Sequence, residues 1–218
     1  MNVGPNLVGQ SGLTYFGRTT ASISHELKNA LAIIKENAGL LGDYLLMADK
    51  GVSIDPARFK TVATRIEDQV ARADGIIKNL NRFAHSVDDP VKVLDLNELA
   101  GLLGVLSQRE AAMRQVTLHV CPESATTTVT TAPYLLLTLL GRCLSVCLQY
   151  MGAGKALAVR VTKEGAGGRI SFESLDAAAL ATAGTFPGEN ESALLSAVGA
   201  DYHLDGTQGR MAITLSNR

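Results

Sequence analysis

The chain lacks tryptophan, and aromatic residues make up only 5% of its 218 residues. Its three cysteines are an odd number without the spacing of a disulfide framework, which favours a reducing cytoplasm. No apolar run reaches the roughly 18 residues of a membrane span, and no basic-then-apolar secretory signal opens the chain. Twenty basic residues against twenty-one acidic give a net charge of −1, without the basic excess of nucleic-acid-binding proteins. We therefore expect a soluble cytoplasmic protein with neither a membrane nor a nucleic acid as partner.

The first half of the chain is predicted to be helical. Residues 1–13 contain Gly, Pro, Asn and Ser without periodicity and are expected to form a flexible tail. From about residue 14, apolar residues recur at steps of three and four, as on one face of a helix. This first stripe comprises Ile23, Leu27, Ala30, Ile34, Ala38, Leu41 and Leu45.

A second helix is predicted to start at Asp55-Pro56, where a capping carboxylate precedes a proline at the first helical position. Its apolar stripe comprises Phe59, Val62, Ile66, Val70, Ala73, Ile77, Leu80 and Ala84. Two helices of roughly 30 residues joined by a short loop form an antiparallel hairpin. We assign this hairpin to residues 14–88.

Several apolar residues of the hairpin lie off these two stripes: Ile33, Leu40, Leu46, Ile76 and Phe83. A second copy of the hairpin would cover them in a dimeric four-helix bundle, which is the arrangement we expect. The alternative is that the other half of the same chain covers them.

The segment Ser86–Pro90 ends the helical pattern and marks a boundary, so residues 89–218 form a second predicted domain. Strands are expected near 91–94, 116–121, 126–130, 156–162, 169–173, 202–204 and 211–215. Helices are expected over about 95–115, 133–151 and 191–198. This order predicts an α/β sandwich, so the whole chain is of the α+β class: a helical hairpin followed by one helix-on-sheet domain.

The candidate reactive residue is His25. At about 100° per residue, the column His25, Asn29, Ala32, Glu36 and Asp43 lies opposite the first stripe, so His25 should face solvent. An exposed neutral imidazole on a rigid helix can act as a nucleophile. Glu26 can hold the ring or accept its proton, Asn29 can orient a water or phosphoryl oxygen, and Lys28 can offset phosphoryl charge. The alternative is an ordinary surface histidine among solvated charges.

The segment Ser24–Ile34, which reads SHELKNALAII, resembles the H-box of bacterial sensor histidine kinases. That motif reads Ser-His-Glu-Leu-(Arg/Lys)-(Thr/Asn)-Pro-Leu and lies early in the first helix of a helical hairpin. The resemblance implies that His25 is the phosphoacceptor, that Glu26 is the general base of autophosphorylation, and that Asn29 aligns the water for dephosphorylation of a partner. Ala30 stands where the family usually has proline, which removes a kink but no chemical group.

The second domain is similar to the family's ATP-binding domain in the order of its elements, but not in its nucleotide motifs. Aligning Ala132-Pro133 with the family's Asp-Pro places Arg142 and Val146 where two asparagines normally stand, and valine cannot ligate Mg²⁺. The segment Ser174–Ala178 replaces the family's Asp-x-Gly-x-Gly, and residues 177–190 contain no Gly-x-Gly lid. The resemblance thus implies an ATPase-like domain without its ATP lid, so ATP is not expected as a cofactor.

An intact H-box beside an altered nucleotide site favours a histidine phosphotransferase of a phosphorelay, with response-regulator receiver domains as partners. The chain would bind no cofactor or metal of its own, and Mg²⁺ would come from the receiver. Cys143 and Cys147 share a helical face without a second ligand pair, which is typical of core residues. The alternatives are an atypical but active sensor histidine kinase, a non-catalytic dimeric module that binds a kinase or receiver, and a fragment of a longer chain.

Overall fold

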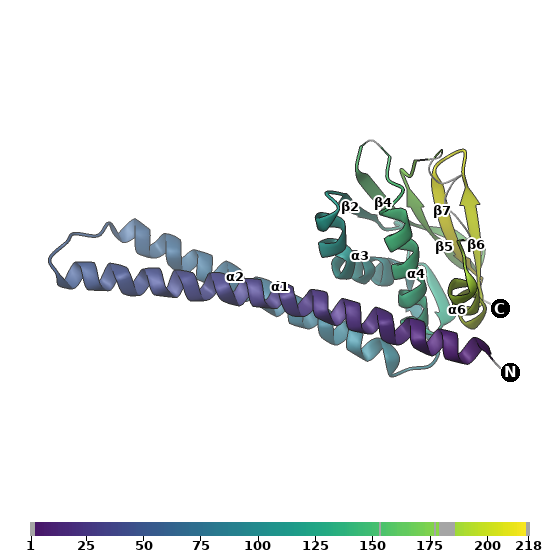
Figure 1. The fold of residues 1–218 in the computed structure, drawn as a ribbon, viewed down its shortest axis with the longest axis horizontal. Coiled ribbons are helices and arrows are strands. Elements are labelled where there is room, and N and C mark those ends of the chain that lie inside the picture. The colour runs from purple at the N-terminus through teal and green to yellow at the C-terminus, as the bar shows by residue number, and fades with distance from the viewer. Residues whose placement is uncertain (1–2, 153, 177, 179–185, 217–218) are drawn as a thin grey trace. The chain divides into compact units, whose positions relative to one another are not determined.

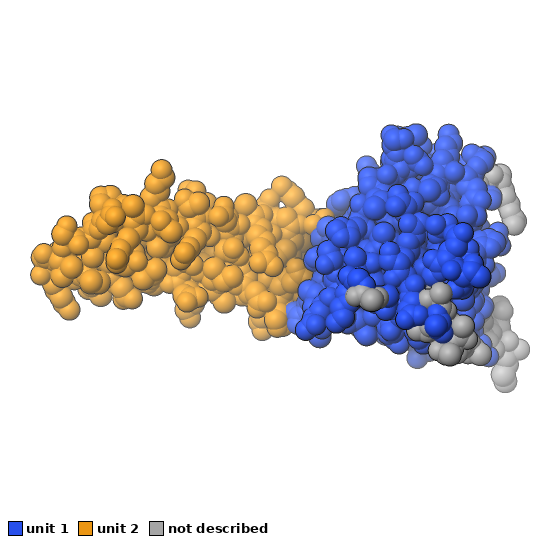
Figure 2. Space-filling model, turned by 90° about the horizontal axis from the view of Figure 1, so that it is seen from above, with its two compact units in different colours: residues 1–19, 82–218 blue, residues 20–81 orange. Residues whose placement is uncertain are grey.

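The computed structural model describes residues 3–152, 154–176, 178 and 186–216. The chain forms two compact units (Figure 2): residues 20–81 make one, and residues up to Thr19 together with those from Arg82 onward make the other. We call them the hairpin unit and the sheet unit. The division falls after Asn81, before the boundary expected at residue 88.

Two helices make the hairpin, as predicted. Helix α1 spans Val3–Asp49 and helix α2 spans Pro56–Ala84. The Asp55 carboxylate accepts a hydrogen bond of 2.9 Å from the Ala57 amide, which caps α2 in the way that the Asp-Pro pair predicts. Near the turn, the rings of Tyr44 and Phe59 meet edge to face at 5.6 Å.

The buried line of α1 within the hairpin unit differs in part from the predicted stripe. Ile23, Ala30 and Asn37 are buried at seven-residue intervals, whereas Ala38 and Leu45 are exposed. A seven-residue repeat follows the 3.5-residue period of paired helices, which keeps one seam on the partner helix. The prediction was wrong at Ala38 and Leu45 because it favoured apolar residues over the polar Asn37 that continues this repeat.

The expected flexible tail is helical from Val3 onward, so that prediction was wrong. Ser11 and Gly12 are buried in the sheet unit, and the Tyr134 hydroxyl donates a hydrogen bond to the Gly12 carbonyl. An added Cβ at Gly12 would lie 2.9 Å from the Tyr134 ring, and one at Gly141 would overlap the Tyr15 ring. Because small residues make this contact, no apolar stripe in the sequence predicts it.

Phe83 was predicted on a flank of the hairpin but lies in the core of the sheet unit, with no exposed surface. Its ring stacks on Phe16 at 5.4 Å and meets Tyr15 edge to face at 5.7 Å. These aromatic contacts, together with those of Gly12 and Gly141, attach the first turns of α1 to the sheet unit.

The rest of the sheet unit is an α/β sandwich (Figure 1), as predicted. Its strands are β1 (Lys92–Asp95), β2 (Thr117–Cys121), β3 (Thr128–Thr131), β4 (Ala156–Glu164), β5 (Gly167–Glu173), β6 (Ala200–Asp205) and β7 (Arg210–Leu215). Its helices are α3 (Leu96–Met113), α4 (Pro133–Cys147) and α6 (Glu189–Val198), with a short 3₁₀ turn η1 at His85–Val87.

The main sheet has the strand order β2-β4-β5-β7-β6, with β2 and β4 parallel and the other pairs antiparallel. β1 and β3 form a separate antiparallel pair. Helices α3, α4 and α6 cover one face of the main sheet (Figure 1). The core between the layers is built from α4, where Leu136, Leu140 and Leu144 are fully buried, and from the inward side chains of β4 and β5.

Candidate phosphoacceptor site on the helical hairpin

His25 lies on α1 within the hairpin unit and is exposed. All other members of its column, Asn29, Ala32, Glu36 and Asp43, are exposed as well. The outward presentation expected from the helical spacing is therefore confirmed. A regular helix holds the imidazole, so its backbone position is fixed while its ring remains accessible.

Asn29 is the residue that contacts the His25 ring. Its side-chain amide lies one turn further along α1, and its Nδ2 donates to the Nδ1 of His25 at 3.3 Å. With Nδ1 accepting this bond, the proton of the neutral ring sits on Nε2. The orientation of the Asn29 carboxamide is thus coupled to the tautomer of the His25 ring.

Glu26 and Lys28 are not joined to this pair. Glu26 is half-buried and Lys28 is exposed, and neither makes a hydrogen bond or ion pair to His25 within the described residues. The structure thus brings His25 and Asn29 together and leaves the other two predicted site residues beside them on the same turn of helix.

A groove lies between α1 and α2 on the flank that carries His25, and no pattern in the sequence predicts it. It has a volume of about 420 Å³ and is lined by Ile33, Glu36, Asn37, Leu40, Arg65, Asp68 and Gln69. At about 100° per residue, Ile33 and Glu36 lie on the same side of the buried line of α1 as His25 and Asn29. Only the helix–helix pairing shows which residues of α2 complete the groove.

The region of the expected nucleotide motifs lies in the sheet unit, on α4 and α6. The Arg142 guanidinium donates to the Glu191 carboxylate, whose side chain is 7% exposed. The same carboxylate accepts a 2.9 Å hydrogen bond from the Gly188 amide, which caps α6. Arg142 is thus committed to an ion pair within the protein.

The other polar group on this part of α4 is also engaged. The Ser145 hydroxyl donates to Glu110 on α3 at 3.0 Å, and Glu110 lies 3.5 Å from the Arg18 guanidinium. Val146 offers no polar atom. Of the segment 177–190, where a lid was expected to be missing, residues 177 and 179–185 lie outside the described residues.

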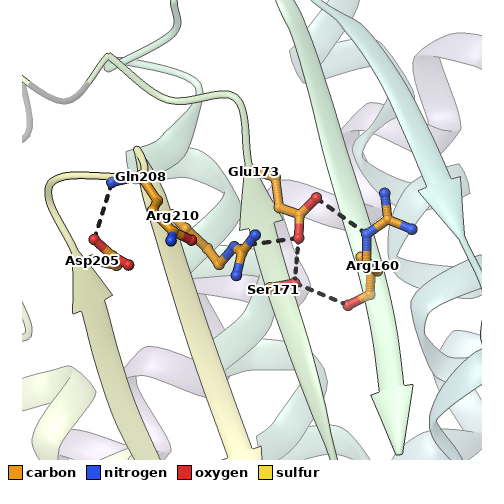
Figure 3. Close-up of polar contacts among 6 residues, drawn as sticks. All are labelled: Arg160, Ser171, Glu173, Asp205, Gln208 and Arg210. Carbon is orange, nitrogen blue, oxygen red and sulfur yellow. Dashed lines mark hydrogen bonds and ion pairs between the residues drawn. The ribbon is translucent and has the colours of Figure 1, made fainter.

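A second polar cluster lies on the strands β4, β5 and β7 (Figure 3). Glu173 accepts from Arg160 Nε at 3.1 Å and from the Ser171 hydroxyl at 3.2 Å, and its other ion-pair partner is Arg210 at 3.4 Å. Two guanidiniums thus share one carboxylate. Arg160 and Ser171 hydrogen-bond to Glu173, whereas Arg210 contributes an ion pair only and its buried Nε makes no hydrogen bond among the described residues. Such a cluster is typical of a network that stabilises a sheet face.

The described residues contain no group of three or more His, Cys, Asp or Glu side chains arranged to hold a metal ion. None of the described helices is long and apolar enough to cross a bilayer.

Comparison with known proteins gives likenesses of structure only. No family model and no curated protein sequence matches the chain. Among solved structures, the Acinetobacter baumannii histidine kinase AdeS is 14% identical with a TM-score of 0.45, over 87% of this chain and 95% of that one. The cytoplasmic segment of histidine kinase QseC is 16% identical with a TM-score of 0.44, over 68% and 94%.

A structure described as a bacterial phosphotransferase is 14% identical with a TM-score of 0.47, over 91% of this chain and 94% of that one. The function proposed below rests on this chain's own residues.

Proposed function

We propose that the protein is a histidine phosphotransferase of a two-component phosphorelay, which moves a phosphoryl group between His25 and response-regulator aspartates without using ATP. The observation that carries this proposal is the exposed His25–Asn29 pair on the hairpin, within a segment that resembles an H-box. A phosphoacceptor must be reachable by a partner protein and held in a defined ring orientation, and this pair meets both requirements.

The transfer needs a ring nitrogen with a free lone pair. That nitrogen attacks the phosphorus of a receiver aspartyl phosphate, the N–P bond forms, the P–O bond to the aspartate breaks, and the aspartate leaves as a carboxylate. When Asn29 Nδ2 donates to Nδ1, the ring proton of that tautomer is on Nε2. Rotation of the Asn29 carboxamide by about 180° presents its oxygen to Nδ1–H and frees the Nε2 lone pair for attack.

The neighbouring charged residues have supporting roles in the proposal. Glu26 accepts a proton from the imidazole, and Lys28 offsets the charge of the phosphoryl group. The receiver supplies its own aspartate, Mg²⁺ and lysine, so little is required of this chain beyond a positioned imidazole.

The residues on α4 support transfer without nucleotide. A Mg²⁺–nucleotide complex needs oxygen ligands, yet Val146 has none and the Arg142 head is paired with the buried Glu191. If the Arg142 guanidinium moved away to make room for a nucleotide, the Glu191 carboxylate would stay buried without its cation, which costs free energy. These residues therefore do not fit an ATP site.

A second copy of the chain is proposed to cover the flank of the hairpin opposite the groove, and not Ile33 and Leu40, which the apolar pattern predicted it would cover and which line the groove. Leu31 and Leu45 on α1 and Val70 and Ile77 on α2 lie on that flank and are 44–59% exposed. Burying such a run of apolar side chains is the usual driving force for a four-helix bundle. The dimer would leave His25 and the groove accessible.

The test is phosphoryl transfer from purified receiver domains, each phosphorylated with acetyl phosphate. We expect the wild-type protein to acquire an acid-labile label and the His25→Ala variant to acquire none. His203→Ala, which removes another exposed histidine in the sheet unit, is the matched control and should be labelled normally.

The remaining outcomes separate the alternatives. Label from ATP alone that Glu26→Gln abolishes would identify a kinase instead. A stable receiver complex without any label, unaffected by His25→Ala, would identify a non-catalytic binding module.

A further inference from the structure

Three sulfur-containing side chains lie together in the core of the sheet unit. Cys143 and Cys147 lie one turn apart on α4, and both are fully buried. The Sγ of Cys147 lies 3.7 Å from the Sδ of Met211 on β7. The spacing of the two cysteines does not reveal this third sulfur, because Met211 lies 64 residues beyond Cys147 in the chain.

A phenol beside these thiols makes no hydrogen bond. Tyr202 lies on β6, the strand at one edge of the main sheet (Figure 1). Its Oη is buried and has no hydrogen-bond partner among the described residues. Burial raises the pKa of Tyr202 to about 12, and the neighbouring thiols of Cys143 and Cys147 add to that rise. A thiol is a weak acceptor and a thiolate a strong one, so a metal bound by these sulfurs would give the phenol O–H a partner.

The donor atoms define the class of ion that this cluster suits. Thiolate and thioether ligands select Cu(I), whereas Mg²⁺ and Ca²⁺ require oxygen ligands. Two metal–sulfur bonds of about 2.3 Å span the 3.7 Å between the sulfurs of Cys147 and Met211 at a near-tetrahedral angle. The two sulfurs can therefore share one ion without a large movement of either side chain.

The charge of the bound state is the main cost of such a site. Binding of Cu⁺ to both cysteine sulfurs releases two thiol protons to solvent, so the net charge of the core changes by −1 and no atom changes its oxidation state. Burial opposes this change, since it raises the pKa of both thiols. The Arg142 guanidinium, which lowers the pKa of Cys143, and the Tyr202 O–H act in the opposite direction.

The edge of the sheet offers a route to the sulfurs. The Tyr202 ring is half-buried and meets the Phe186 ring edge to face at 5.7 Å. Its strand, β6, has a ladder of hydrogen bonds on one side only, to β7. Local opening of such an edge costs less free energy than global unfolding, and it would move Tyr202 away from the thiols.

We propose that Cys143, Cys147 and Met211 form a Cu(I) site in the sheet unit, with Tyr202 as the hydrogen-bond donor to its thiolates. This inference goes beyond the proposed function, because binding of the ion requires neither His25 nor a receiver domain.

The experiment titrates the purified full chain with the Cu(I)–bicinchoninate complex under anaerobic conditions and follows the loss of the chelator's colour. We expect about one ion per wild-type chain. Cys147→Ser should weaken binding at least about 100-fold, because it removes a thiolate ligand. Met211→Leu removes the thioether at similar volume and should weaken binding about tenfold.

Two further variants complete the set. Tyr202→Phe should weaken binding about threefold, because it removes the donor to the thiolates. Cys121→Ser changes the half-buried cysteine of β2 and is the matched control, which should still bind about one ion per chain. Thermal unfolding without the ion reports whether each variant is folded, and Cu(I) should raise the Tm of the wild-type protein.

Three results would overturn the inference: no transfer of the ion to the wild-type protein, loss of binding in Cys121→Ser, or wild-type affinity in a folded Met211→Leu protein. None of them bears on the proposed function, because that function is measured by the label on His25. Wild-type stoichiometry together with the expected order of the variants would establish the site.

Discussion

The polar side chains around His25 in the hairpin unit and those of helix α4 in the sheet unit differ in exposure and in their partners. In the hairpin unit, His25, Asn29 and the groove residues Glu36, Arg65 and Asp68 are exposed, and Gln69 keeps an unpaired acceptor. In the sheet unit, the polar groups of α4 are engaged within the protein: Arg142 with Glu191, Ser145 with Glu110, and Tyr134 with the Gly12 carbonyl. The polar groups beside His25 are thus accessible, whereas those of α4 are paired within the protein.

In the proposed function, this contrast accounts for phosphoryl transfer without nucleotide by a chain with the element order of an ATP-binding domain. Contacts across an inner surface replace the ligand-binding groups, and the domain keeps its packing. Four predictions test the contrast between the two units, in descending order of expected effect.

The largest effect is expected on the apolar flank of the hairpin unit. Leu31→Glu combined with Val70→Glu should raise the dimer dissociation constant at least about 100-fold, because two charges would enter an apolar interface. Sedimentation equilibrium measures this constant. Asp43→Lys, a change of charge on the exposed His25 column, is the control and should leave the dimer intact. Equal dissociation constants for the wild type and the double variant would show that this flank is not the interface.

In the sheet unit, Gly141→Ala should lower the free energy of unfolding by about 1–3 kcal/mol, because the new methyl group would overlap the Tyr15 ring. Urea denaturation measures the loss. At Gly101 of α3 an added Cβ would meet nothing within 4 Å, so Gly101→Ala should stabilise the helix by up to about 1 kcal/mol. We expect the rate of transfer per folded molecule to stay the same in both variants. A change in that rate would show that the sheet unit takes part in transfer, contrary to a purely structural role.

Asn29→Ala should slow transfer from the phosphorylated receiver about tenfold, equivalent to about 1.4 kcal/mol, because it removes the amide that orients the His25 ring. The exposed position predicts an unchanged melting temperature. Single-turnover labelling gives the rate, with Asp43→Asn as the matched control. A wild-type rate in Asn29→Ala would mean that the pairing with His25 has no part in the chemistry.

The smallest effect concerns alkaline pH and the sheet unit. Burial raises the pKa of Tyr202 from 10.0 to about 12, so the folded state holds this phenol neutral while the unfolded chain ionises it. Its contribution to stability is complete below pH 10 and is lost as the pH rises from 10 toward 12. Tyr202→Phe should therefore lose less stability than the wild type between pH 9 and 11, as measured by urea denaturation. Identical slopes for both proteins would contradict this assignment.

Much of this fold follows from local patterns in the sequence. Apolar periodicity locates both hairpin helices, the Asp55-Pro56 pair marks where α2 begins, and β-branched alternation locates the strands. The outward direction of His25 follows from spacing alone, because a helix fixes the angle between its residues.

The parts that escaped prediction depend on contacts between distant residues. The first turns of α1 contact the sheet unit where Gly12 meets Tyr134, and small residues give no periodic signal. The groove needs the register of α1 against α2, which brings Asn37 and Gln69 to one surface. The sequence shows that Arg142 stands where the resemblance predicts an asparagine. It does not show that Glu191 is the partner of Arg142, because the two residues lie far apart in the chain.

The most direct test of the account offers the same preparation two phosphoryl donors, labelled ATP with Mg²⁺ and a labelled phospho-receiver, and measures the acid-labile label on His25. We predict label from the receiver alone, lost in His25→Ala, and none from ATP at millimolar concentration. Label from ATP in the wild-type protein that disappears in His25→Ala would contradict the account, because the closed sheet unit would then be supplying the phosphoryl group.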